Sequence, residues 1–149
     1  MPTKIFNTSF ENMLRVLLLL DCEKTPLSAD RITYIDFICL YGKDYDVLEQ
    51  NINGDNRFGL AEFTNKTLVI KEAISKAVRN NYIKVCVTPK GLAYEINERG
   101  RAIVEDIKSL QFSKKYSSGA QLLLTKFKKE DDTSLLSIIQ NKALELEVN

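Results

Sequence analysis

The sequence predicts a mainly α-helical protein with one small β-hairpin, and two observations from its middle carry that prediction. Small and apolar residues recur at steps of three and four between residues 62 and 80, which is the period of a helix. Residues 82–87 and 92–97 are rich in β-branched and aromatic side chains, and Pro89 and Gly91 between them are typical of a tight turn. A long helix, a short link and a two-stranded ribbon form the second half of a winged helix-turn-helix domain, so we predict that fold.

Two further helices are expected ahead of this segment. Thr8 and Glu11 form a capping-box pattern before an apolar helix, on which Arg15 is expected to lie on the face away from the core. Ser28 is the expected N-cap of a second helix that ends near residues 40–41. Two helices joined by a short loop fit the start of a helix-turn-helix.

Residues 42–60 break the helical pattern and predict a long inserted loop. Asp44, Asp46, Asp55 and Asn56 offer oxygen ligands, but their spacing does not match a calcium loop. We therefore favour a solvated loop and predict no metal site.

The remainder predicts a C-terminal helical extension. Asn97 is the expected N-cap of a helix that either runs past Phe112 or bends at residues 117–119. A charged linker over residues 126–132 precedes a last amphipathic helix, capped by Thr133 or Ser134. We divide the chain into a winged-helix domain over residues 1–118 and an extension over residues 119–149.

The apolar face of the last helix is a candidate surface for binding a partner, and a stronger functional lead than contact with DNA. Two interpretations stay open: the helix folds back on its own domain, or it lies in a groove of a partner or a second copy. The candidate partner-binding residues are Leu135, Leu136, Ile139, Ala143 and Leu146.

Composition excludes several classes of function. The 149 residues contain no histidine, which removes the commonest general base and metal ligand, and no phosphate-binding loop or zinc-finger spacing is present. We predict no catalytic residue and no cofactor. Three widely spaced cysteines indicate reduced thiols and a cytoplasmic protein, and no apolar run is long enough for a membrane span.

Charge permits a contact with DNA without requiring one. Residues 61–132 carry fourteen Lys and Arg against nine Asp and Glu. Lys76 and Arg79 on the third helix, with Lys84 and Lys90 on the hairpin, are the candidate DNA contacts. These charges are sparse, and Glu72 and Lys76 form an i,i+4 pair typical of a solvated helix face, which is the interpretation we favour.

Several stretches carry a resemblance to a known family. They are residues 12–20, the run Leu-Ser-x-x-Arg-Ile-x-x-Ile-Asp-Phe-Ile over residues 27–38 with its continuation to residue 41, Asp44-Tyr45, Glu62-Phe63, residues 91–96, Gly100 and Tyr116. In these residues the chain resembles the middle component of bacterial ABC-three-component systems, which include the Lamassu type of anti-phage defence.

The resemblance implies a small non-enzymatic adaptor. Its partners would be an SMC- or Rad50-like ATPase that senses foreign DNA and an effector subunit, frequently a nuclease, and no catalytic residue carries over. Arg31 and Asp36 are expected to cap or bridge neighbouring helices. The alternative from another class is a stand-alone winged-helix transcriptional regulator that binds DNA as a homodimer.

Overall fold

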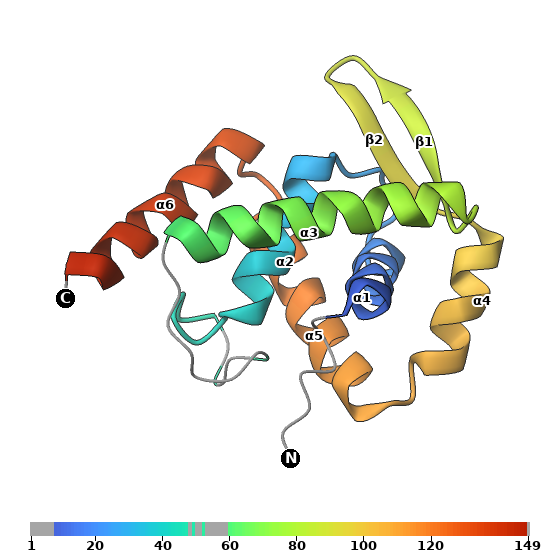
Figure 1. Ribbon diagram of the computed structural model, residues 1–149, viewed down its shortest axis with the longest axis horizontal. Helices are drawn as coiled ribbons and strands as arrows, with labels where there is room; N and C mark the ends of the chain where they lie inside the picture. Colours follow the sequence, from blue (N-terminus) through green and yellow to red (C-terminus); the bar gives the residue numbers. More distant parts are fainter. Residues whose placement is uncertain (1–7, 48, 50–51, 53–59, 149) are drawn as a thin grey trace.

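The computed structural model of the chain describes residues 8–47, 49, 52 and 60–148. Within these residues the chain is mostly helical with one antiparallel hairpin, which confirms the predicted fold class (Figure 1). The elements in order are α1 (Ser9–Asp21), α2 (Ala29–Leu40), α3 (Leu60–Arg79), β1 (Ile83–Thr88), β2 (Gly91–Ile96), α4 (Glu98–Ile107), α5 (Gln111–Lys126) and α6 (Asp132–Val148).

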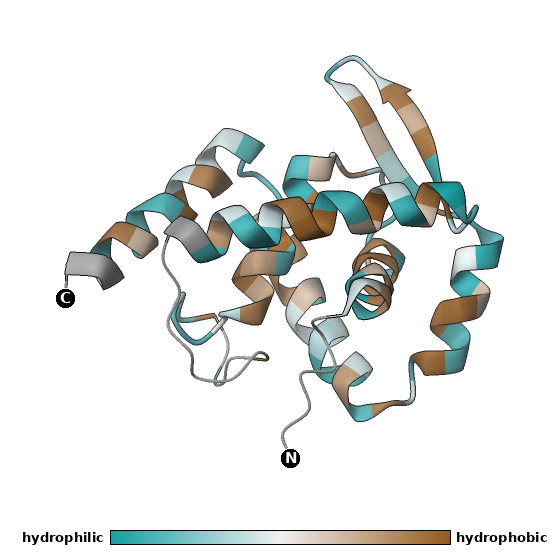
Figure 2. Cartoon of the chain, in the orientation of Figure 1, coloured by the Kyte–Doolittle hydropathy of each residue, from teal (hydrophilic) through white to brown (hydrophobic). Residues whose placement is uncertain are grey.

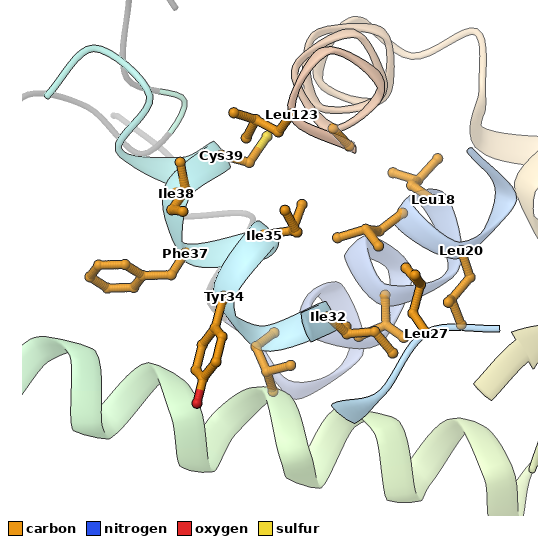
Figure 3. Packing of buried hydrophobic residues seen from close by; sticks show 14 of the residues in the cluster. Leu18, Leu20, Leu27, Ile32, Tyr34, Ile35, Phe37, Ile38, Cys39 and Leu123 are labelled. Atoms are coloured by element: carbon orange, nitrogen blue, oxygen red, sulfur yellow. The ribbon is translucent and has the colours of Figure 1, made fainter. Parts of the chain in front are cut away.

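Helices α1 and α2 form the centre of the core. Both predicted N-caps are confirmed: the Thr8 hydroxyl accepts a hydrogen bond from the Glu11 backbone N–H, and the Ser28 hydroxyl accepts one from the Arg31 N–H. Beyond these caps, residues 12–20 and 32–40 are all buried, as expected for helices that are apolar around most of their circumference. Ile35 and Leu18 point toward each other between the two helices, and Cys39 points toward α5 (Figure 3).

Helix α3 crosses over both central helices (Figure 1). Phe63 packs its ring against Phe37 and Tyr34 of α2, with ring centroids 5.1 and 6.0 Å apart, and Ile70 and Ala77 continue the buried face. The helix ends just before the asparagine pair at residues 80–81, as the sequence predicted. Asn81 has a φ of 61°, a left-handed conformation that ends helices.

The hairpin follows directly and projects from the body of the molecule (Figure 1). Strands β1 and β2 pair in continuous register from Ile83↔Ile96 at the base to Thr88↔Gly91 at the tip. Gly91 has a φ of +117°, which a residue with a side chain rarely adopts, so the turn requires glycine there. Leu27 adds an isolated bridge to the outer edge of β2 by exchanging two backbone hydrogen bonds with Tyr94.

The C-terminal helices depart from the prediction in two places. The helix capped by Asn97 ends at Ile107, and a separate helix, α5, starts at Gln111 and runs unbroken through residues 117–119. The expected bend there is therefore wrong, and so is the expected run past Phe112. The N-cap of α6 also lies two or three residues earlier than predicted, because the Asp131 side chain, and not that of Thr133 or Ser134, accepts a hydrogen bond from the backbone N–H of Ser134.

Two other expectations concern the inserted loop and the domain boundary. About half of the inserted loop over residues 42–60 lies outside the described residues, although Tyr45, Val47 and Ile52 pack against the core. The proposed boundary between residues 118 and 119 falls inside α5, whose buried residues on both sides of it, Tyr116 and Leu123, belong to the same core.

Candidate functional site

A buried charged cluster joins three helices at the centre of the molecule. The Arg15 guanidinium of α1 donates two hydrogen bonds to the Asp36 carboxylate of α2, at 2.9 and 3.2 Å, and the Tyr116 hydroxyl of α5 donates a third at 2.5 Å. Arg15 and Tyr116 are 0% exposed and Asp36 is 1% exposed. The expectation that Asp36 bridges helices is confirmed, whereas the placement of Arg15 on the outer face of α1 is wrong.

The environment of the cluster keeps Arg15 charged and Tyr116 neutral. Burial by itself would lower the pKa of Arg15, but the charge and hydrogen bonds of Asp36 outweigh it, so that the pKa of the guanidinium is raised. Burial, together with the Asp36 charge, raises the pKa of the Tyr116 hydroxyl well above its ordinary value. No water can reach these groups, and their arrangement serves to hold α1, α2 and α5 together rather than to transfer protons.

Arg31 makes a second bridge, which ties the α5–α6 linker to the start of α2. Its guanidinium donates to the carbonyl oxygens of Phe127 at 2.5 Å and Glu130 at 2.7 Å, and to the Asp132 carboxylate at 3.2 Å. Ser28 donates to the other Asp132 oxygen at 2.6 Å. The bridging role expected for Arg31 is thus confirmed, and we call these contacts the Arg31 clasp.

A groove of about 650 Å³ lies between the clasp and the tip of the hairpin. Leu27, Ala93 and Leu124 contribute apolar lining, and Lys90 faces the linker across it. The pKa of Asp131 on the linker is lowered, first by the hydrogen bond from the Ser134 backbone and also by the charge of Lys90. The groove therefore carries both signs of charge, with the linker acids Glu130, Asp131 and Asp132 beside Arg31, Lys90 and Lys128.

The four candidate DNA-contacting residues have different neighbours. Arg79 forms an ion pair with Glu72 at 3.2 Å, and Lys84 forms one with Glu95 at 2.9 Å. The Lys76 ammonium lies 3.4 Å from the Ser9 hydroxyl at the start of α1. Lys90 lies at the hairpin tip beside the linker acids. The structure does not gather the four into one cluster with shared neighbours.

The candidate partner-binding face of α6 is turned inward in this chain. The helix packs on α2 and α3, and Leu135, Ile139 and Ala143 are all 0% exposed, while Leu136 is half-buried. The side chain of Leu146 lies outside the described residues. Of the two interpretations left open by the sequence, packing on its own domain is the one that this structure contains.

Among the residues whose exposure the structure describes, the most exposed apolar side chain lies on the hairpin, a surface that the sequence did not single out. Val85, Val87 and Leu92 are 43, 86 and 56% exposed. We call these three residues the hairpin patch, and Figure 2 shows hydrophobic residues on both projecting strands. The signal was present in the sequence: apolar residues occupy every second position of both strands, and a ribbon attached at one end buries only its base.

Two further kinds of site are absent from the described residues. Within them, no three acidic or cysteine side chains lie close enough to hold a metal ion, and none of the helices has the length and apolar character needed to cross a bilayer. The chain is thus a small helical domain held together by internal polar bridges, with an apolar ribbon on its outside.

Comparison with known families identifies the class of protein. The model of the ABC-three component (ABC-3C) system Middle Component 2 family matches residues 5–147. The chain therefore belongs to this family, and it is a middle component of a system that has further subunits. No curated protein and no solved structure matches the chain.

Proposed function

We propose that this protein is a non-enzymatic adaptor that couples a DNA-sensing, SMC- or Rad50-like ATPase to an effector subunit, a nuclease, in defence against phages or plasmids. The observation that carries the proposal is the family match over residues 5–147, which makes the chain one component of a larger assembly. We further propose a system of the Lamassu type, on the residues that carry the resemblance, and a cytoplasmic location, on the odd number of unpaired cysteines.

The surface supports an adaptor more than an enzyme. The buried polar groups of Arg15, Asp36 and Tyr116 bond to one another and bridge helices. What remains outside is an apolar patch on a projecting hairpin, and exposed apolar patches mark sites of association with other proteins.

We also propose that residues 1–118 form a winged-helix domain. The order α1, bridge at Leu27, α2, α3, β1 and β2 supports it, because the isolated bridge at Leu27 lies between the first two helices, where such domains have a short strand. The connection between α2 and α3 spans residues 41–59, whereas a DNA-binding helix-turn-helix joins its helices by about three or four residues. This difference favours a role in assembly over the stand-alone regulator.

Co-expression with the two other components of its own system tests the proposal. The tagged chain should co-purify with both the ATPase and the effector, and cells carrying all three components should resist phage infection. A matched strain lacking only this chain should lose protection, because the ATPase and the effector would no longer be coupled. If the purified chain binds neither component but protects a palindromic DNA site as a homodimer, the adaptor proposal is wrong and the regulator is right.

A further inference from the structure

The outer edge of β1 has backbone hydrogen-bonding groups that no described residue uses. In an antiparallel ladder, opposed residues alternate between pairs that exchange both hydrogen bonds and pairs that exchange none. Tyr94 of β2 gives its N–H and C=O to Leu27 on the far side, so its cross-strand partner Val85 belongs to a pair that exchanges none. Val85, and Val87 two residues on, therefore direct their N–H and C=O groups away from β2, toward open solvent.

The side chains along this edge are apolar on one face of the ribbon. Val85 and Val87 stand on the same face as Leu92 and Tyr94, their partners in the register. At the base of this face Ile83 and Ile96 enter the core, at 2 and 5% exposure, whereas Val87 near the tip is 86% exposed. The hairpin thus extends the apolar surface of the core outward without covering it.

The edge has few of the features by which proteins prevent strands from pairing with others. Such features are prolines in the edge strand, β-bulges and charged side chains, lysine above all. Strand β1 has no proline and its register with β2 is unbroken, and its one charged residue, Lys84, forms an ion pair with Glu95 at 2.9 Å. A six-residue strand of this kind is open to a further strand.

We propose that β1 is the docking edge for an extended strand of a partner subunit in the same complex, which adds to the hairpin as a third strand beside β1. This inference rests on the proposed function, because it names the surface through which the adaptor binds. The partner strand carries apolar side chains at alternate positions, where they cover Val85 and Val87. On the opposite face it carries an acidic residue beside Lys84. Lys84 and Arg101 together place two positive charges there, and Glu95 balances only one of them.

A second copy of this chain fits the edge less well than a partner subunit. A strand of six residues is about 20 Å long, and a stable interface buries roughly 800 Å² on each side. The projecting ribbon supplies only a part of that area, so an occupant must also contact the body of the molecule. Pairing β1 with β1 of a second copy, with Cys86 facing Cys86, would moreover place neutral Thr88 opposite Lys84 and leave the positive charge unanswered.

Amide hydrogen exchange of the chain, alone and bound to its co-expressed partner subunits, tests the pairing directly. In the free chain the amides of Val85 and Val87 should exchange fast and those of Lys84 and Cys86, which bond to β2, slowly. In the complex the amides of Val85 and Val87 should become protected by tenfold or more. A partner that only covers the apolar face would leave these two amides fast, and that result overturns the inference.

Substitutions separate the inference from the proposed function. Val87→Lys and Val87→Pro should each weaken capture of the partner by at least tenfold, the first by charge and the second by removing an outward N–H. Cys86→Ser, on the other face, is the matched control and should bind as the wild type does. Thermal unfolding of each variant verifies that the domain is intact, and Val87→Lys retains every backbone group of the hairpin.

The outcomes are distinct. Wild-type protein that captures no subunit contradicts the proposed function. Wild-type protein that captures its subunits, together with Val87 variants that do so equally well, contradicts only the docking edge. A wild-type dimer in light scattering that Val87→Lys converts to a monomer would assign the edge to a second copy and overturn the inference as well.

Discussion

Arg15 donates two hydrogen bonds to the Asp36 carboxylate, so that α1 and α2 are joined by a buried ion pair. The pair lies among apolar side chains of the same two helices, and each charge depends on the other to stay buried. Removing one partner leaves an uncompensated charge in the core, which costs about 3–5 kcal/mol.

We therefore expect Arg15→Met to lower the free energy of unfolding by about 3–5 kcal/mol, measured by urea denaturation. The triple variant Arg15→Met, Asp36→Leu, Tyr116→Phe removes all three polar groups together and should recover most of that loss, because none of the three is left without its partner in the cluster. Equal destabilisation of the single and triple variants would show that shape, and not pairing, is what the cluster provides.

Replacement of Arg31 should loosen the C-terminal helices. Arg31→Ala removes three hydrogen bonds to the α5–α6 linker, two of them to carbonyl oxygens, and a hydrogen bond from a charged group contributes about 1.5–3 kcal/mol. We expect faster proteolysis at residues 127–132 and a loss of stability of about 2 kcal/mol. Lys71→Ala is the matched control, because its ion pair with Asp30 is half-exposed at both ends and such pairs contribute about 0–1 kcal/mol. Identical behaviour of the two variants would contradict the clasp.

The three cysteines should differ in reactivity and in pH dependence. Burial raises the pKa of Cys22 to about 11 and raises that of Cys39 well above its ordinary value. The pKa of Cys86 is raised too, by desolvation and by the charge of Glu95, but this thiol lies on the projecting hairpin, within reach of reagents. At pH 8 we expect one thiol, Cys86, to react quickly with a disulfide reagent, and Cys86→Ser should abolish that phase. Three equal reaction rates would contradict this order of reactivity.

The stability of the protein should also depend on pH through Cys22. Because the pKa of Cys22 in the folded state exceeds the value of 9.0 of an unperturbed thiol, its contribution to stability is complete below pH 9 and is lost as the pH rises toward 11.

Gly100 should not tolerate even a methyl group. A Cβ at this position would collide with the backbone carbonyl oxygen of Tyr82 and lie 2.7 Å from Ile96 Cγ1. Gly→Ala inside a helix normally stabilises by roughly 0.5–1 kcal/mol, but here we expect a loss of about 1–3 kcal/mol from overpacking. Thermal unfolding of Gly100→Ala against Arg101→Ala, an exposed neighbour, gives the comparison, and a stabilised Gly100→Ala would contradict the close packing.

DNA binding by the isolated chain should depend only weakly on salt. If Lys76, Arg79, Lys84 and Lys90 all contacted phosphates, the logarithm of affinity would fall against the logarithm of salt concentration with a slope of about −4. Because these residues already have separate protein neighbours, we expect a slope shallower than about −2 in fluorescence anisotropy. A slope of −4 that reversal of the four charges removes would establish direct contact.

Local chemistry was enough to predict the first half of the fold. Three predicted N-caps accept hydrogen bonds from backbone N–H groups at the starts of α1, α2 and α4: Thr8, Ser28 and Asn97. The break between α4 and α5 escaped prediction because Leu110, the residue before α5, makes no side-chain cap, and no glycine or proline marks the gap. Packing of α5 on α1 and α2 determines where that helix starts.

The interior polar groups were harder to place. A single arginine on an apolar helix is assigned to the surface by periodicity alone, since burial of a charge requires a partner from a distant segment. Asp36 is that partner. It too lies within an apolar run of the sequence, and this position was the available signal that its carboxylate is buried. The hairpin patch required the structure, because exposure depends on how far the ribbon extends past the core.

The inward packing of α6 has a consequence for how the protein is made. Leu135, Ile139 and Ala143 complete the core against α2 and α3, which the ribosome synthesises much earlier. Until these residues are made, the nascent chain exposes the apolar surfaces of α2 and α3 that α6 later covers. During that interval these surfaces are open to aggregation, and chaperones or early contact with the partner subunits would protect them.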